Sequence, residues 1–218
     1  MKNWYKPVKR GLDILGALAL MMVLSPLFLL IMLAIAVDSE GNVLFPQSRM
    51  GRNGRPFIIF KFRTMYLQTP TETPTGALSD PERFITPVGR FLRRTSLDEL
   101  PQLFNILKGD MSFIGPRPVV LAERQLLSLR RDKGADSVRP GITGLAQVRG
   151  RDEVSIRAKA GYDAFYARRM SPALDAWIFW RTFRCVFTGE GIREGAPKPS
   201  SRHWKEPAHR RSRLYPLF

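Results

Sequence analysis

The sequence has very little cysteine and histidine. Cys185 is the only cysteine among its 218 residues, and His203 and His209 are the only histidines. A single cysteine excludes an internal disulfide and is typical of a reducing compartment. One cysteine and two histidines cannot form a zinc cluster. Any metal is therefore expected to be a hard, oxygen-ligated cation such as Mg²⁺.

Acidic residues are also scarce relative to basic ones. The chain has 19 Asp and Glu against 35 Lys and Arg, which gives a formal net charge of +16. This excess predicts an anionic partner, either nucleic acid, acidic lipid head groups or a phosphorylated substrate. The sequence has no P-loop and no G-x-G-x-x-G motif, so the common nucleotide fingerprints do not explain the charge.

One long uncharged segment, Ile14–Val37, stands out near the N-terminus. It exceeds the roughly 20 apolar residues that a membrane helix needs. The Ala34–Ala36 stretch resembles a signal-peptidase site. However, the apolar region of a signal peptide is only about 7–15 residues long, so we favour a retained membrane segment.

Basic residues precede and follow this segment, and therefore favour the cytoplasm for both of its ends. They are Lys2, Lys6, Lys9 and Arg10 before it, and Arg49, Arg52, Arg55, Lys61 and Arg63 after it. At the midpoint, Pro26 removes a backbone N–H and clashes with the carbonyl of Met22. Ser25 is expected to bond back to the carbonyl of Met21. We expect a re-entrant helix broken at Ser25 and Pro26, with a Pro-kinked spanning helix as the alternative.

After the apolar segment, Val43–Phe45 and Phe57–Phe62 are expected to form a short β-hairpin with an Asn-Gly turn between them. Lys61 and Arg63 would share one face of the second strand. They form either a phosphate clamp or the solvated side of the strand. Leu174–Phe187 is an aromatic, apolar helix with interspersed arginines, either part of the core or lying along a membrane surface.

The chain is thus expected to adopt an α+β fold that is mostly helical, with surface-lying amphipathic helices. We divide it into a re-entrant membrane helix (1–38), a cytosolic, membrane-associated catalytic domain (39–190) and a basic tail (191–218). The tail is rich in basic residues and proline. It is expected to be flexible and attracted to anionic lipid.

The most informative stretch is residues 96–118, SLDELPQLFNILKGDMSFIGPRP, which carries the adjacent carboxylates Asp98 and Glu99. Arginines lie on both sides of this pair, namely Arg90, Arg93, Arg94 and Arg117. A carboxylate pair among arginines suits a site that attacks a phosphate. One carboxylate would be the nucleophile and the other a Mg²⁺ ligand.

A structural alternative for the pair is a helix cap. Ser96 and Glu99 fit the capping-box pattern ahead of an apolar run. Pro101 opposes that pattern because it would fall where the helix needs an N–H. The helix is therefore expected to begin later and to leave both carboxylates at its N-terminal end. The local chemistry alone leaves cap and catalytic pair equally open.

Two rigid turns, Gly115–Pro118 and Arg139–Gly144, each carry one arginine. Arg117 and Arg139 on such stiff backbone suit bidentate phosphate binding, although most turns of this kind are only turns.

Four stretches occur in a fixed order over about Lys9–Val186. They are KRGLDILGALALMMVLSPLFLLIMLAIA, FKFRTM, TPVGRFLRRTSLDELPQLFNILKGDMSFIGPRP and VRPGITGLAQVRGRD. They resemble the bacterial sugar transferases, small monotopic phosphoglycosyl transferases that act on polyprenyl phosphate. The resemblance implies a helix broken at Ser25 and Pro26, on the cytoplasmic face of the bacterial inner membrane.

By this resemblance, Asp98 attacks the sugar-bearing phosphate of a UDP-sugar and expels UMP, while Glu99 binds Mg²⁺. Undecaprenyl phosphate then attacks the aspartyl phosphosugar, which initiates synthesis of a cell-surface glycan. The resemblance also implies further substrate-binding positions, with Arg117 and Arg139 as phosphate or nucleotide contacts. The other positions are Lys61, Arg93, Arg151 and Asp163.

Some positions depart from the family pattern. Leu145 stands where an aromatic residue is frequent, and Arg149 and Asp152 stand where Asn is frequent. The GRDEVSI stretch resembles a branch that handles N-acetylated hexosamines or 6-deoxy sugars, but the sugar itself stays open. So does a homodimer.

Two rival hypotheses are a basic membrane protein that binds nucleic acid or acidic lipid, and an inactive scaffold. A nucleic-acid surface would exclude acids from its binding face, so we expect no nucleic-acid partner. The intact pair of Asp98 and Glu99 argues against a scaffold.

Overall fold

The computed structural model describes residues 4–69, 80–150 and 154–188, and the predicted tail 191–218 lies outside them. The fold is α+β and mostly helical, as predicted. Its helices are α1 (Tyr5–Asp38), α2 (Pro87–Thr95), α3 (Gln102–Lys108), α4 (Arg124–Asp132), α5 (Leu145–Val148), α6 (Ile156–Arg169) and α7 (Pro172–Thr188). Its strands are β1 (Leu44–Met50), β2 (Pro56–Phe62), β3 (Ser112–Ile114) and β4 (Gly141–Thr143). Short 3₁₀ turns are η1 (Arg52–Gly54), η3 (Pro81–Phe84), η4 (Leu97–Glu99) and η5 (Ala135–Ser137).

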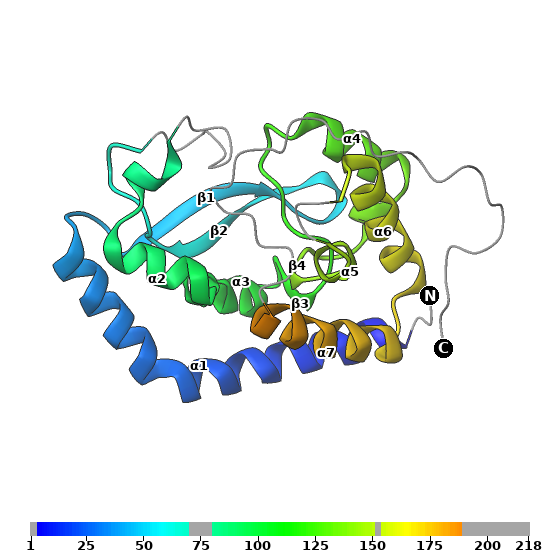
Figure 1. The fold of residues 1–218 in the computed structure, drawn as a ribbon. Coiled ribbons are helices and arrows are strands. Elements are labelled where there is room, and N and C mark those ends of the chain that lie inside the picture. The colour runs from blue at the N-terminus through cyan, green and yellow to red at the C-terminus, as the bar shows by residue number, and fades with distance from the viewer. Residues whose placement is uncertain (1–3, 70–79, 151–153, 189–218) are drawn as a thin grey trace.

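The long helix α1 runs beneath the rest of the molecule and changes direction near its middle (Figure 1). Pro26 lies inside the helix, where its missing N–H and its ring account for such a bend. The hydroxyl of Ser25 donates to the carbonyl of Met22 at 2.8 Å. The prediction of Met21 as its acceptor was therefore wrong by one residue.

The first turns of α1 are bound to the globular part of the chain. Arg10 donates from Nη1 to the carbonyl of Ile106 (2.6 Å) and from Nη2 to that of Leu107 (2.9 Å). These carbonyls lie in the last turn of α3, where a cation is favoured. The carboxylate of Asp13 accepts from the backbone N–H of Phe113 at 3.2 Å.

The other end of α1 is bound to the same globular part. Arg63 is buried and donates to the carbonyls of Ser39 and Glu40, just beyond the helix. The carboxylate of Asp38 accepts from the N–H of Val88, at the start of α2 (3.3 Å). Arg63 is therefore neither a phosphate clamp nor a solvated residue. Both expectations for it were wrong because its guanidinium binds these two carbonyls beyond the end of α1.

The hairpin predicted from the Asn-Gly turn is present. β1 and β2 pair antiparallel from Leu44 opposite Phe62 to Met50 opposite Pro56. Asn53 and Gly54 have φ values of 56° and 70°, which this residue pair adopts more easily than others.

Helix α3 holds one strand of this hairpin through a single buried side chain. Asn105, which is fully buried, accepts from the N–H of Phe60 (3.0 Å) and donates to the carbonyl of Ile58 (2.7 Å). Both hydrogen bonds lie just ahead of Lys61. They fix the end of β2 relative to the η4–α3 segment.

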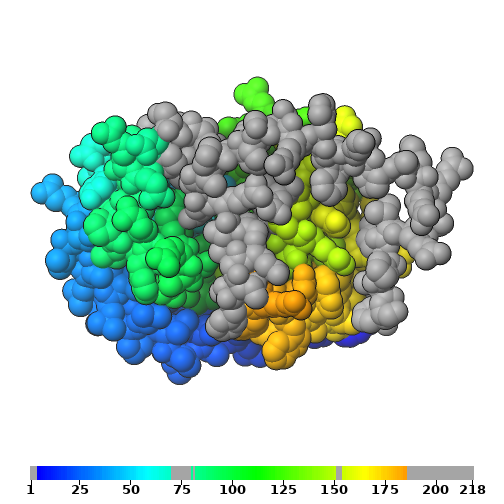
Figure 2. Space-filling view, viewed as in Figure 1, coloured from blue at the N-terminus to red at the C-terminus, as the bar shows by residue number. Residues whose placement is uncertain are grey.

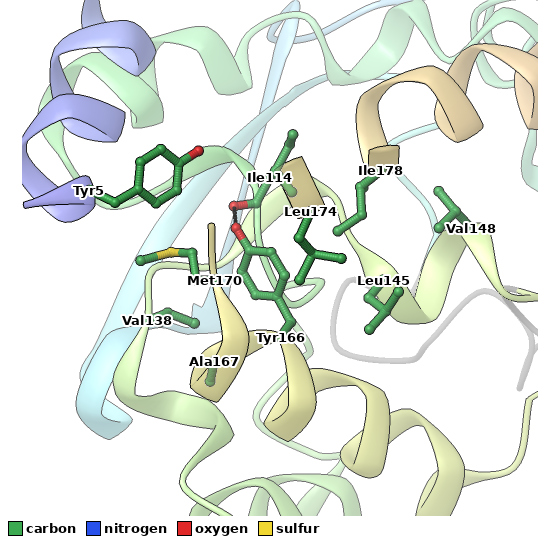
Figure 3. Packing of buried hydrophobic residues seen from close by; sticks show 10 residues of the cluster. All are labelled: Tyr5, Ile114, Val138, Leu145, Val148, Tyr166, Ala167, Met170, Leu174 and Ile178. Atoms are coloured by element: carbon green, nitrogen blue, oxygen red, sulfur yellow. Dashed lines mark hydrogen bonds between the residues drawn. The ribbon is translucent and has the colours of Figure 1, made fainter. Parts of the chain in front are cut away.

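The two Gly-Pro turns flank a small parallel pair, β3 and β4. A Cβ on Gly115 would lie 2.3 Å from the carbonyl oxygen of Arg139, so only glycine fits this approach. A larger apolar cluster packs beside β3, with Tyr166 at its centre (Figure 3). The Tyr166 hydroxyl lies within hydrogen-bond distance of the Ile114 carbonyl (2.9 Å) and of Asp175 Oδ1 (2.8 Å), joining α6, β3 and α7.

Candidate active site

The adjacent carboxylates Asp98 and Glu99 lie in the 3₁₀ turn η4, between α2 and α3. Ser96, which ends α2, has a left-handed backbone (φ 57°). Its side chain makes no capping hydrogen bond to η4 in the part of the chain that the structure describes. The capping-box alternative is therefore wrong. Helix α3 begins after both carboxylates, as expected from Pro101.

Two cations from distant parts of the sequence converge on Glu99. Lys61, on β2, places its Nζ 2.9 Å from Glu99 Oε1 and 3.7 Å from Asp98 Oδ2. Arg117, in the turn after β3, places Nη2 3.5 Å from the same Glu99 oxygen. The side chains of Lys61, Asp98 and Glu99 are each less than one-fifth exposed. Partial exclusion of water strengthens these charge interactions relative to an open surface.

Two more of the predicted arginines lie near or beyond this group. Arg93 lies in the last turn of α2, and its carbonyl accepts from the N–H of Ser96 at 3.2 Å. Arg151 lies outside the described residues. A role for either in substrate binding stays a prediction.

Arg139 contacts the far end of α3. Its Nε donates to the carbonyl of Gly109 at 2.8 Å. Burial lowers the pKa of Arg139, and the nearby charges of Arg10 and Arg52 lower it further. These contacts hold the Arg139 side chain at the C-terminal end of α3 in this structure. Its predicted contact with phosphate is untested.

Asp163 lies on α6 and is linked to the site through Arg130. It is 1% exposed, and its Oδ2 lies 2.6 Å from Nη2 and 2.8 Å from Nε of Arg130. Burial raises the pKa of the Asp163 carboxyl, while Arg130 opposes that shift. Arg130 also donates to the carbonyl of Arg117 at 2.8 Å. Asp163 thereby acts on the backbone that carries Arg117.

Sequence reasoning missed Arg130 and Arg49. Arg130 lies four residues after the buried Leu126 on α4. An arginine at that spacing is on the apolar face of its helix, which is a signal for a buried ion pair. Arg49 lies on β1 and places Nη1 3.4 Å from the carbonyl of Pro118, beside Arg117.

The carboxylates also fit the predicted metal. Among the described residues, no three His, Cys, Asp or Glu side chains form a preassembled metal cluster. Mg²⁺ does not need one, because it usually takes one or two carboxylates together with substrate phosphates and water. Glu99 and Asp98 supply that many oxygen ligands. A cation there would compete with Lys61 and Arg117 for Glu99.

Comparison with known proteins identifies the family of this chain. The model of the family described as "Bacterial sugar transferase" matches residues 4–189, which include every described element. The chain belongs to the bacterial sugar transferase family.

Three relatives illustrate the range of this family. The first is the UDP-N-acetylgalactosamine-undecaprenyl-phosphate N-acetylgalactosaminephosphotransferase of Aeromonas hydrophila, 39% identical over 87% of this chain and 46% of its own length. The exopolysaccharide production protein ExoY of Sinorhizobium fredii is 38% identical over 84% of this chain and 87% of its own. The UDP-glucose:undecaprenyl-phosphate glucose-1-phosphate transferase of Caulobacter vibrioides is 41% identical over 82% and 66%.

These sugar transferases differ in length and in the sugar for which they are named. The chain spans less than half of the Aeromonas protein but most of the Sinorhizobium protein. The Aeromonas name specifies N-acetylgalactosamine and the Caulobacter name glucose. The prediction that this chain is a sugar transferase is confirmed at the level of the family.

Proposed function

We propose that this protein transfers a sugar 1-phosphate from a UDP-sugar to undecaprenyl phosphate and releases UMP. The observation that carries the proposal is the pair Asp98 and Glu99, with Lys61 and Arg117 brought against it. The names of the Aeromonas and Caulobacter relatives, which specify these two substrate classes, support it. The reaction would initiate synthesis of a cell-surface glycan.

The proposed reaction has two displacements at one phosphorus atom. A carboxylate oxygen of Asp98 attacks the sugar-bearing phosphorus, and the bond from that phosphorus to the UMP oxygen breaks. An oxygen of undecaprenyl phosphate then attacks the same phosphorus and displaces Asp98, which yields undecaprenyl diphosphosugar. A covalent intermediate lets a soluble and a lipid substrate use one small site in turn.

The neighbouring residues have separate proposed roles. Lys61 and Arg117 neutralise phosphate oxygens as charge develops on them. Glu99 would hold Mg²⁺, which when bound would supply positive charge to the diphosphate and make UMP a better leaving group. Asp163 supports Arg117 through Arg130.

The membrane attachment is proposed to be monotopic, on the cytoplasmic face of the bacterial inner membrane. Helix α1 is long and apolar enough to cross a membrane. However, Arg10 near its start and Asp38 at its end both contact the same globular part. A helix tied at both ends to one side enters the bilayer and returns. Met22 and Val23, next to the break, are 78% and 73% exposed, as lipid-facing residues would be.

Helix α7 is proposed to lie along the same membrane surface. It forms the lower margin of the molecule together with α1 (Figure 2), and Lys9 of α1 is ion-paired to Asp175 of α7 (2.7 Å). Trp180 is 72% exposed and contacts Phe179 and Phe183 edge-on or tilted. An exposed aromatic group beside arginines suits the interface with anionic lipid.

The activity is tested with the purified protein, Mg²⁺, undecaprenyl phosphate and a panel of UDP-sugars that includes N-acetylated hexosamines and 6-deoxy sugars. We expect UMP release with one or a few donors, and a phosphosugar adduct on the protein by intact mass spectrometry when the lipid is left out. Asp98→Asn should lose both signals. Asp132→Asn, which alters an exposed carboxylate on α4, should lose neither. Wild-type turnover by Asp98→Asn would contradict the assigned nucleophile.

A further inference from the structure

Arg49 and Lys61 lie on the same face of the β1–β2 hairpin. Lys61 pairs across the strands with Phe45, and Arg49 pairs with Phe57. Alternation along an antiparallel pair therefore directs both cations to the same side. Lys61 contacts Glu99 on that side, and Arg49 lies farther along the hairpin toward its turn.

Most of the hydrogen-bond donors of Arg49 lack a well-placed acceptor among the described residues. Nη2 donates to Oε1 of Gln47 on its own strand. The contact of Nη1 with the Pro118 carbonyl is long, at 3.4 Å. Nε is buried and has no hydrogen-bond partner in the described part of the chain. A guanidinium has five donors in a fixed plane, so Arg49 retains capacity for an acceptor that this protein does not itself supply.

Arg49 also lies close to another cation. Burial lowers the pKa of Arg49 to about 10, with a further lowering from Arg117, while Glu123 and Glu99 oppose the shift. Two guanidinium groups near each other in a partly buried setting repel. An anion bound between them would remove that repulsion and accept from both.

We propose that Arg49 and Arg117 together bind the diphosphate of the nucleotide donor at the Asp98–Glu99 pair. The inference rests on the proposed function and adds a second arginine to its donor site. Arg117 reaches Glu99 directly, and Arg49 approaches the same turn from β1. Arg49 contacts one phosphate group and Arg117 the other, so the pair favours a diphosphate over a monophosphate.

The alternative is that Arg49 is only a structural support, or strut, that holds β1 against the 116–118 turn. A backbone hydrogen bond already makes that connection, from the N–H of Met50 to the carbonyl of Val119 at 3.0 Å. A strut would change the binding of every ligand at the site equally. A phosphate-binding arginine changes the preference between ligands.

The test is to titrate UDP and UMP into full-length protein in detergent with Mg²⁺ and measure Kd by calorimetry. An Asp98→Asn background keeps the proposed nucleophile from attacking UDP. We expect Arg49→Gln to raise the Kd for UDP by at least tenfold, since a hydrogen bond to a charged group is worth about 1.5–3 kcal/mol. The Kd for UMP should rise much less. Arg55→Gln, which alters an exposed arginine of the same hairpin, should leave both values within twofold.

The outcomes separate the two proposals. Failure of UDP to bind the background protein would contradict the proposed function itself. Binding of UDP that Arg49→Gln leaves unchanged, or a loss equal for UDP and UMP, would overturn the role of Arg49 only. Arg49→Lys keeps the positive charge and the aliphatic part of the side chain, so it serves as a second variant in case Arg49→Gln does not fold. It should raise the Kd for UDP at least threefold, because an ammonium lacks the planar pair of donors with which a guanidinium binds phosphate. An unchanged ratio of the UDP and UMP Kd values would again overturn the inference.

Discussion

At the scale of single residues, Glu99 is the point on which the site is built. Its Oε1 is ion-paired both to Lys61 on the hairpin and to Arg117 in the turn after β3. The carboxylate therefore orients two cations toward the position where the phosphate of a substrate would lie. Its neighbour Asp98, the proposed nucleophile, lies farther from Lys61, at 3.7 Å.

Replacement of Lys61 by Met should reduce kcat/KM for UMP release by about 10²–10³-fold, because a preorganised charge near the phosphate is lost. Initial rates over a range of UDP-sugar concentrations measure this. Lys133→Met, at an exposed site beyond α4, is the matched control. Equal rates for the two variants would show that Lys61 only neutralises Glu99.

Replacement of Asp163 by Asn should destabilise the protein by about 3–5 kcal/mol, since it leaves Arg130 buried without its counter-charge. Denaturant titration in mild detergent measures the free energy of unfolding. The exposed carboxylate Asp132 gives the control variant Asp132→Asn, for which we expect no change. The double variant Arg130→Met, Asp163→Leu should be more stable than Asp163→Asn, and the reverse order would contradict the buried ion pair as the cause.

Residue identities were predictable where chemistry and spacing coincide. Asp98 and Glu99 are adjacent in sequence with arginines on both sides, which marked them as a candidate pair, but only the structure excluded the capping box at Ser96. The pairing of Asp163 with Arg130 joins two helices 33 positions apart, and spacing along one helix could not reveal it. Arg49 was read only as a flanking positive charge, because nothing local distinguishes it from Arg52 or Arg55.

At the scale of elements, α1 and the hairpin are anchored by side chains that bind backbone carbonyls or N–H groups. Arg10 and Arg63 bind the carbonyls at two helix ends, and Asn105 binds one strand of the hairpin. The hairpin was predictable from its Asn-Gly turn. The β3–β4 pair was not, because two three-residue strands about 30 positions apart give no periodic pattern.

Single cysteines near the two ends of α1 should be labelled from the same side of a sealed membrane vesicle. In a Cys185→Ser background, Lys6→Cys and Glu40→Cys place thiols at exposed positions before and after the apolar segment. A membrane-impermeant maleimide measures their access. Labelling from opposite sides would establish a spanning helix.

Replacement of Pro26 by Ala should straighten α1. Alanine restores the backbone N–H that can bond to the Met22 carbonyl and removes the ring that bends the helix. The two labels in the same assay should then move toward opposite sides. Leu27→Ala, next to the break, is the control that leaves Pro26 in place, and unchanged labelling in Pro26→Ala would show that the end contacts alone impose the return.

At the scale of the whole molecule, most of the exposed large apolar residues belong to two helices. Helix α1, along its length, and helix α7 supply them, and both helices lie along the lower margin in Figures 1 and 2. The chain as a whole carries a formal net charge of +16. A basic body with one apolar side suits a protein that rests on anionic lipid.

Trp180 should be quenched by phospholipids brominated on their acyl chains when the protein is reconstituted. It is 72% exposed on the proposed membrane side, whereas Trp177 packs against the core and lies under Arg149. In a Trp4→Phe, Trp204→Phe background, which leaves these two tryptophans, Trp180→Phe should remove most of the quenchable emission and Trp177→Phe much less. Equal quenching before and after Trp180→Phe would place α7 away from the lipid.

Helix α3 connects the two halves of the proposed function. Arg10 of the membrane helix donates to two carbonyls in the last turn of α3, and the two carboxylates lie just before the first turn of α3. Seven residues of helix rise by about 10 Å, so α3 holds its contact with the membrane helix and the two carboxylates at its opposite ends. We therefore expect the proposed nucleophile to keep a fixed distance from the membrane helix, and with it from the lipid phosphate that is its proposed second substrate.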